Sequence, residues 1–198
     1  MKFNSRSKTL LVMLLCLSLI ATGCSAAWIK VALADLPVLL QMALNIGTLV
    51  TTLQSGQQLS SSEAATIQNI SNEASRDLNL LQTLYNEYEA SPSSATVQKI
   101  QNGIAEINQN LPALLQATHV SDAVLSTRIT AAVNLILSTV NSFAALIPAS
   151  GAMTAKRVAR RATTVPHASD LKKQWNQQVC GPSGKAVLDS AFAICELK

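Results

Sequence analysis

The sequence predicts an all-α protein: an antiparallel up-down four-helix bundle followed by a small helical C-terminal extension. Four successive segments within residues 36–148 carry apolar side chains at alternating three- and four-residue steps, which places them on one face of an α-helix. Short polar connections rich in Ser, Gly and Pro separate the segments. Such short connections make successive helices antiparallel neighbours, so the four apolar faces can close around one core.

Residues 1–23 are typical of an export signal. Residues 2–8 carry three cations and no acid, and a mostly apolar run follows over residues 10–20. This run is too short to span a bilayer, which needs roughly 20 apolar residues, and its cationic flank fits a secretory signal. Small side chains at Ala21-Thr22-Gly23 then precede Cys24. Residues 1–24 thereby resemble the signal of exported bacterial lipoproteins, whose lipobox ends in the cysteine that receives the lipid.

This resemblance implies that Cys24 is the lipid-attachment residue and the first residue of the mature protein. It would carry two or three acyl chains, palmitate among them, which is enough for stable anchoring. In Gram-negative members of this family, a residue other than Asp after the cysteine implies the outer membrane, and Ser25 meets that condition. We therefore expect a lipid-anchored envelope protein, facing the periplasm from the outer membrane if the cell is Gram-negative. An ordinary secretory signal with a chance cysteine is the alternative.

Residues 24–35 are expected to form a lipidated N-terminus and a short tether. Trp28 and Lys30 suit the headgroup layer of a bilayer. Packing of Trp28 into the bundle is the equally weighted alternative. Either arrangement holds the domain close to the membrane.

The first bundle helix is expected from about Leu36 to Leu53, with Asp35 as its cap and Pro37 in its first turn. It has no charged residue, as membrane-spanning helices often do not, but its two opposite stripes favour a bundle helix. The polar stripe is Gln41, Asn45, Thr48 and Thr52. The apolar stripe is Leu36, Leu39, Ala43, Ile46, Val50 and Leu53.

The second helix is expected to start at a capping box, Ser60 to Glu63, and to run to about Ala90. The third has the most regular stripe, but Pro112 falls inside it and predicts a kink or break near Asn110. The second stripe is Ile67, Ile70, Ala74, Leu78, Leu81, Leu84 and Tyr88. The third is Val97, Ile100, Ile104, Ile107, Leu111 and Leu114.

The fourth helix is expected after a cap at Ser121 or Asp122 and to end before Pro148. Its stripe is Leu125, Ile129, Ala132, Ile136, Val140, Phe143 and Ile147. Residues 149–198 form the basic C-terminal extension, in which we expect a short helix from Ser169 or Asp170 to Val179. A last helix is expected to carry Val187, Leu188, Phe192 and Ile194.

Four cations stand near the start of this extension, and they share one face if their segment is helical. They are Lys156, Arg157, Arg160 and Arg161. Three roles are open: docking on the acidic bundle, a solvated face, or contact with anionic lipid or envelope polymer. A lipid tether would raise the effective concentration of such a surface near headgroups.

Cys180 and Cys195 are the two thiols that remain beyond the signal and the lipobox. Exported proteins meet oxidising surroundings, so a disulfide is the default expectation, and its loop of about 15 residues would contribute about 3 kcal/mol. A simple helical hairpin opposes this pairing, because it places the two Cα atoms roughly 15 Å apart, beyond the limit of about 7 Å. Pairing therefore requires the chain to fold back differently after Gly184.

No residue pattern predicts catalysis, a metal or a cofactor. His119 and His167 fall in expected loops, and the chain has no HExxH, CxxC or GxSxG motif. Residues 181–186 are superficially similar to a phosphate loop, but Val179 and Ala186 replace the required Gly and Ser/Thr. We therefore expect no enzyme.

The charge pattern argues against nucleic acid as a partner. Residues 24–149 carry a net charge of −4 and residues 150–198 one of +5, so an exported mature chain is nearly neutral. The whole sequence has 13 Gln and 12 Asn, so much of its polarity comes from neutral amides, which exert little long-range steering.

The expected function is that of a non-enzymatic interaction or structural module, held on the bilayer by acylated Cys24 and presenting helix faces to an envelope protein. One alternative is a membrane-active protein that inserts its uncharged first helix. Another is a carrier with a small ligand inside the bundle. A carrier needs polar side chains on the core stripes, which are almost wholly Leu, Ile, Val and Ala.

Overall fold

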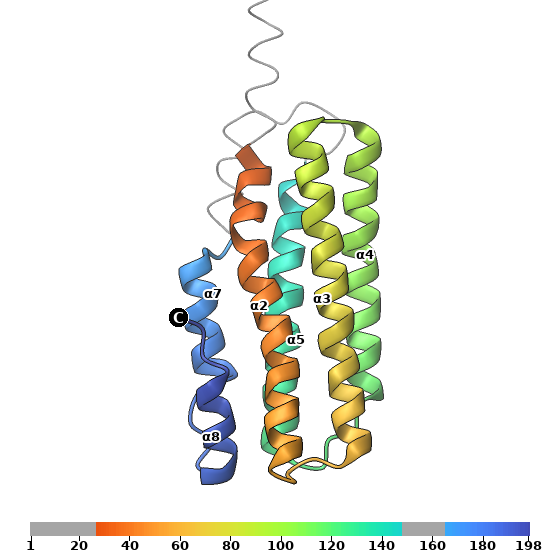
Figure 1. Cartoon of the computed structure of the whole chain (residues 1–198). Coiled ribbons are helices and arrows are strands. Elements are labelled where there is room, and N and C mark those ends of the chain that lie inside the picture. The colour runs from red at the N-terminus through yellow and green to blue at the C-terminus, as the bar shows by residue number, and fades with distance from the viewer. Residues whose placement is uncertain (1–26, 148–164) are drawn as a thin grey trace, which may run out of the picture.

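A computed structural model describes residues 27–147 and 165–198 of the chain. The described residues form α-helices and contain no strand. Four long helices make an antiparallel bundle (Figure 1): α2 (Ala27–Ser55), α3 (Ser61–Ala90), α4 (Ser94–Ala117) and α5 (Ala123–Leu146). Two short helices lie against it: α7 (Ala168–Gln178) and α8 (Ala186–Ile194). The predicted four-helix bundle with a helical C-terminal extension is confirmed.

The four apolar stripes form the core that the sequence predicts. Every stripe residue is buried except Val97 and Leu114, which are partly buried against the same core. Aromatic rings fill one end of the core: the ring of Tyr85 lies 5.6 Å from that of Trp28 and 6.4 Å from that of Phe143. Burial of these large side chains is a dominant source of stability for a bundle of this size.

Helix α2 begins nine residues before the expected start, so residues 27–35 belong to the helix and not to a tether. Trp28 and Ile29 are buried and extend the apolar stripe of α2 by two turns. Trp28 thus packs into the bundle rather than lying in a headgroup layer. Asp35 and Pro37 consequently lie inside α2, and the expected cap at Asp35 is wrong.

The predicted starts of α3 and α5 agree with the structure, because the expected capping side chains are present at both. Ser60 and Glu63 form the capping box of α3, and Asp122 caps α5 by accepting from the N–H groups of Val124 and Leu125. A kink or break was predicted near Asn110, and the break is wrong, because α4 continues through Pro112 to Ala117. Burial of the apolar face of α4 outweighs the one backbone hydrogen bond that proline removes.

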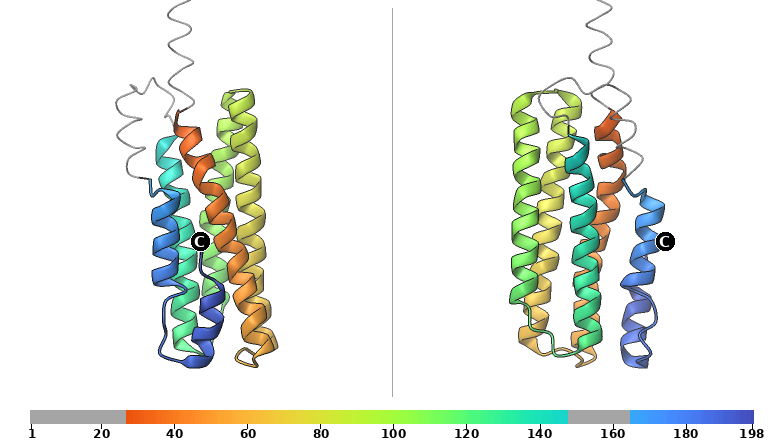
Figure 2. Two further views of the ribbon diagram at one scale, coloured as in Figure 1. Left: turned by 60° about the vertical axis from the view of Figure 1, so that its left-hand side comes forward. Right: turned by 180° about the vertical axis from the view of Figure 1, so that it is seen from behind.

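The C-terminal helices lie along α2 and α5, on the side of these helices away from α3 and α4 (Figure 2). After α7 the chain continues toward the end of the bundle where α2 meets α3, and α8 then runs back (Figures 1 and 2). Helix α8 therefore lies mostly beyond α7 rather than beside it. This course brings Cys195 next to Cys180 and removes the geometric objection to their pairing.

Candidate functional site

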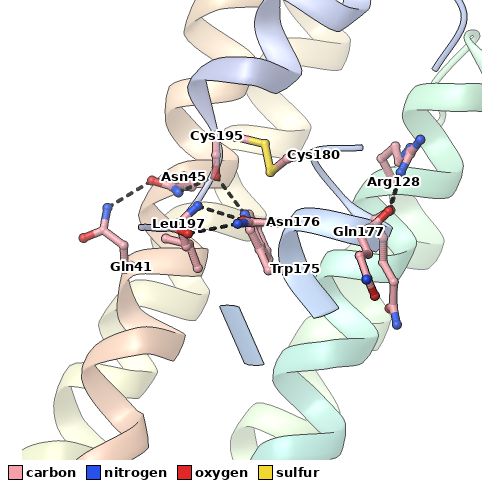
Figure 3. Close-up of a disulfide and its surroundings, with 10 residues drawn as sticks. Gln41, Asn45, Arg128, Trp175, Asn176, Gln177, Cys180, Cys195 and Leu197 are labelled. Carbon is pink, nitrogen blue, oxygen red and sulfur yellow. Dashed lines mark hydrogen bonds between the residues drawn. A yellow bond between two sulfur atoms is a disulfide. The ribbon is translucent and has the colours of Figure 1, made fainter. Parts of the chain in front are cut away.

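The structure brings one of the predicted groups of residues together. Cys180 and Cys195 form a disulfide, with 5.9 Å between their Cα atoms. The expected lipid-attachment residue and the four cations lie outside the described residues, namely Cys24, Lys156, Arg157, Arg160 and Arg161. The candidate site built from described residues is therefore the surroundings of the disulfide (Figure 3).

The main-chain carbonyl of Cys195 is the centre of this site (Figure 3). Nδ2 of Asn45 in α2 donates a buried hydrogen bond to this oxygen at 2.9 Å. Nε1 of Trp175 in α7 donates a second buried bond to it, also at 2.9 Å. Gln41, one turn before Asn45, donates to Oδ1 of Asn45 at 3.0 Å and so helps to orient its amide. One carbonyl group thereby joins the bundle, α7 and the end of α8.

The chain after Cys195 is held along α7 by two side chains. Asn176 accepts from the N–H of Leu197 at 2.8 Å and donates to the carbonyl of Leu197 at 2.9 Å. Nζ of Lys172 donates to the main-chain oxygen of Lys198 at 2.6 Å. We call residues 195–198 the C-terminal tail. Hydrogen bonds from α2 and α7 hold its backbone at Cys195, Leu197 and Lys198.

A groove of 510 Å³ lies between this tail and α2. Val38 and Gln41 line its α2 side, and Ile194 and Leu197 line the other side. Ile194 is 60% exposed, which is unusual for a side chain of this size.

Arg128 of α5 holds the C-terminal end of α7. Its guanidinium donates to the carbonyl of Gln178 at 2.7 Å and to that of Pro182 at 3.0 Å. The last carbonyls of a helix lack partners within the helix, so a donor here satisfies their hydrogen bonds. The positive charge of the donor also interacts favourably with the negative end of the helix dipole. The guanidinium also lies 5.5 Å from the ring centre of Phe192 in α8. Arg128 thus binds both C-terminal helices to the bundle.

The polar side chains of the turn between α7 and α8 bond to the helices beside it. Gly184 has a φ of 78°, a conformation that favours glycine, and Oγ of Ser183 donates to Asp189 at 2.6 Å. Nζ of Lys185 donates to Asp122 at 2.6 Å. These contacts hold the pKa of both carboxyls below the usual value. The turn is a helix connection anchored on α5, as its departure from the phosphate-loop pattern predicts.

The carboxyl group of Asp35 in α2 contacts the first residues of α7. Its side chain is buried, and its Oδ2 atom has no hydrogen-bond partner among the described residues. Burial raises the pKa of this carboxyl, while His167 and the N–H of Ala168 oppose the rise. His167 is the N-cap residue of α7, so the predicted caps Ser169 and Asp170 are wrong. A carboxylate beside the first turn of α7 suits the positive end of its dipole.

Two further observations concern the described residues as a whole. In the ranges 27–147 and 165–198, no three His, Cys, Asp or Glu side chains are arranged to hold a metal ion. Helices α2 and α5 are long and apolar enough to cross a membrane by length and composition alone. In the bundle, 61% and 50% of their most apolar windows are buried.

No protein-family model matches the chain, and no curated protein or solved structure is significantly similar to it. Its function therefore has to be inferred from its own residues. Four residues that build the site were not singled out by any sequence motif: Asn45, Arg128, Trp175 and Asn176. Asn45 did lie on a predicted polar stripe, but that stripe predicted exposure to solvent, whereas the structure buries Asn45 under the tail.

Proposed function

We propose that this protein is a lipid-anchored module of the bacterial cell envelope that acts by binding an envelope protein and not by catalysis. The observation that carries the proposal is the lipobox ending at Cys24, directly before a helix that is part of the folded domain. Only Ser25 and Ala26 separate Cys24 from the first residue of α2. An extended chain spans at most about 3.6 Å per residue, so the lipid would be attached within roughly 11 Å of the bundle.

This short connection supports a defined orientation on the membrane. The start of α2, the connection between α3 and α4, and the end of α5 lie at one end of the bundle (Figure 1). That end would face the bilayer. The chain that carries Lys156 to Arg161 leaves the described bundle after Ile147, at the same end. Contact of these cations with anionic headgroups is part of the proposal, because such lipids attract basic segments close to the surface.

The opposite half of the molecule supports the binding role. On α8, Val187 and Ile194 are 55% and 60% exposed, and residues seven apart share one face of a helix. Ile194 also borders the groove beside α2. Because α8 lies toward the far end of the bundle, this apolar face would lie away from the anchoring bilayer, where a protein partner could reach it (Figure 1).

The anchor is tested by Cys24→Ser in cells labelled with palmitate. We expect Cys24→Ser to abolish labelling and to release the protein from the membrane fraction. Cys16→Ser is the matched control, because Cys16 lies in the part of the signal that is removed. Labelling and membrane association of the Cys24→Ser protein at the level of the control would refute the proposal.

The partner surface is tested with photo-crosslinking amino acids placed at Val187 or Ile194 in intact cells. A crosslinked envelope protein from these positions, but not from the exposed Asn72 on α3, is the expected result. Crosslinks of equal yield from all three positions would contradict a specific surface on α8.

A membrane-active protein is the second candidate, and the apolar character of α2 favours it. In that case α2 would leave the bundle and insert. Leakage of dye from vesicles of anionic lipid separates the two candidates. The anchored module leaves the vesicles intact, whereas insertion of α2 releases the dye.

A further inference from the structure

We propose that the Cys180–Cys195 disulfide is a redox latch. In the oxidised protein it holds the C-terminal unit, which we define as residues 165–198, on α2 and α5. Reduction releases this unit while the four-helix bundle stays folded. The inference does not depend on the lipid anchor, because it concerns contacts within the described chain.

The two helices of the C-terminal unit are too short to be stable alone. Helix α7 has 11 residues and α8 has nine, whereas isolated helices shorter than about 12–15 residues are marginal in water. Their buried side chains, among them Leu171, Trp175 and Phe192, need the surface of the bundle as cover. The unit is therefore either docked on the bundle or largely unfolded.

The disulfide controls the hydrogen bonds that dock the unit. It fixes Cys195 against the end of α7, and this places the Cys195 carbonyl where both Asn45 and Trp175 donate to it. If the tail moves, two buried donors lose their shared acceptor at once. A buried donor without a partner is costly, so small displacements of Cys195 are not tolerated. Docking and the covalent bond are thus coupled through one carbonyl group.

The other polar contacts of the unit are too exposed to replace the latch. The ion pair between Lys185 and Asp122 is solvent-exposed, and so are the bonds from Arg128 to the end of α7. Exposed ion pairs contribute little to stability. Bonds of this kind guide the docked position, but they do not hold an unlatched unit.

The bundle itself does not depend on the latch. Its four stripes face one another in a core that apolar side chains of the unit extend, and its aromatic cluster of Trp28, Tyr85 and Phe143 contains no residue of the C-terminal unit. Both cysteines lie in the unit, so the covalent bond links no two bundle helices. Release of the unit uncovers the side of α2 that carries Asn45 and takes away the wall of the groove that Ile194 and Leu197 form.

The chemistry of the latch is thiol–disulfide exchange. In closing, the thiolate of one cysteine attacks the disulfide of an oxidising envelope protein, and one sulfur of that disulfide leaves as a thiolate. The second cysteine then attacks the mixed disulfide, which forms the Cys180–Cys195 bond and leaves the oxidant as a dithiol. The protein loses two electrons and two protons, and the oxidant gains them. Opening is the reverse reaction with a reduced dithiol as the electron donor, and it requires the unit to loosen first, because both cysteines are buried in the docked state.

Limited trypsin digestion of the full chain in detergent tests this latch. Lys172, Lys173 and Lys185 report on the C-terminal unit, and Arg76 and Lys99 report on the bundle. We compare the oxidised protein, the protein reduced with dithiothreitol, and a Cys180→Ser/Cys195→Ser variant. Mass spectrometry gives the cleavage rate at each site.

We expect cleavage in the C-terminal unit to become at least about ten-fold faster in the reduced and variant proteins, since local opening governs proteolysis. Cleavage at Arg76 and Lys99 should stay unchanged. Two results would overturn the proposal: equal cleavage of the unit in all three proteins, or faster cleavage at every site together. The second result includes a variant that fails to fold.

Digestion of an Asn45→Ala variant tests the coupling between docking and the disulfide while the disulfide is intact. Loss of its bond to the Cys195 carbonyl should speed cleavage of the unit less than reduction does. Thr48→Ala is the matched control on the same polar stripe, because Thr48 is exposed and its hydroxyl donates within α2, to the carbonyl of Leu44. If Asn45→Ala digests like the control, the carbonyl group does not couple the latch to docking.

Discussion

Asn45 and Cys195 lie 150 positions apart in the chain, and the Asn45 side chain donates a buried hydrogen bond to the Cys195 carbonyl at 2.9 Å. The bond joins the first helix of the bundle to the last turn of the protein. Asn45 is only 9% exposed although it lies on the polar stripe of α2. The C-terminal unit therefore covers part of the face of α2 that its sequence makes polar.

Asn45→Ala should lower the free energy of unfolding by about 1–2 kcal/mol, because it removes a buried bond and leaves part of the Cys195 carbonyl unsatisfied. Denaturant unfolding followed by circular dichroism measures this change. Thr48→Ala, at an exposed position on the same stripe, should cost less than about 0.5 kcal/mol, as surface substitutions usually do. Equal losses for the two variants would show that burial of the Asn45 amide is not what matters.

Gly47→Ala should destabilise the pair formed by α2 and α3. An added Cβ would lie 2.8 Å from Oγ of Ser71, which itself donates to the carbonyl of Ala43 at 2.7 Å. We expect a loss of about 1–3 kcal/mol from this overpacking. Thermal unfolding measures the loss.

Gly103→Ala is the matched control for Gly47→Ala. Gly103 also lies inside a helix, but its added Cβ would meet Leu84 at an ordinary contact distance of 3.9 Å. The gain in helix propensity should raise the stability by about 0.5–1 kcal/mol. Opposite signs for the two glycines are the expected outcome. A stabilising Gly47→Ala would contradict the close approach of α2 and α3.

The stability of the bundle should depend on Glu63 between about pH 4.5 and pH 2. Hydrogen bonds from Ser121 and Ser60 lower the pKa of Glu63 from 4.5 to about 2. A carboxyl whose pKa is lower in the folded protein stabilises it above the unfolded pKa. That contribution is lost as the pH falls through the folded pKa.

Unfolding free energies of the wild type and of Glu63→Gln, measured from pH 7 to pH 2, test this dependence. Their difference should be constant above about pH 5 and should shrink toward pH 2. Glu89→Gln, at an exposed position near the end of α3, is the control. A wild-type advantage over Glu63→Gln that persists unchanged at pH 2 would rule out this role of the carboxylate.

Arg128→Lys should loosen the end of α7 without unfolding the bundle. Lysine keeps the charge but lacks the fork that binds the carbonyls of Gln178 and Pro182 together. Hydrogen exchange should become faster at the amides of Val179 and Cys180, which both bond to the carbonyl of Trp175. Unchanged exchange at these amides, or a uniform increase across α5, would contradict the capping role.

The sequence was sufficient to predict the helices that have a regular apolar stripe and a capping residue. The stripes of α3 and α5 and the caps at Ser60 and Asp122 lie where their spacing places them. The start of α2 was missed, because the burial of Trp28 against Tyr85 is a tertiary contact that no local pattern shows. Of the kink or break expected near Asn110, the break was wrong for the same reason, since packing of α4 overrides the local cost of Pro112.

The candidate site was predictable only in part. Oxidising surroundings favoured the disulfide, but its geometry depends on how far the chain travels between α7 and α8 before it turns back. Contacts between separate segments of the chain bring three further residues into the site: Asn45, Trp175 and Asn176. The spacing of residues in one sequence does not predict such contacts. The sequence shows which polar groups these residues carry, but not the groups that they bond to.

The mass of the N-terminal peptide of the protein extracted from membranes is the most direct measurement of the proposed anchoring. The account predicts a peptide that begins at Cys24 and carries the added mass of a diacylglyceryl group, with or without a further acyl chain. It also predicts that no extracted chain retains residues 1–23. A peptide that begins elsewhere, or one in which Cys24 is unmodified, would contradict the lipid anchor and the orientation derived from it.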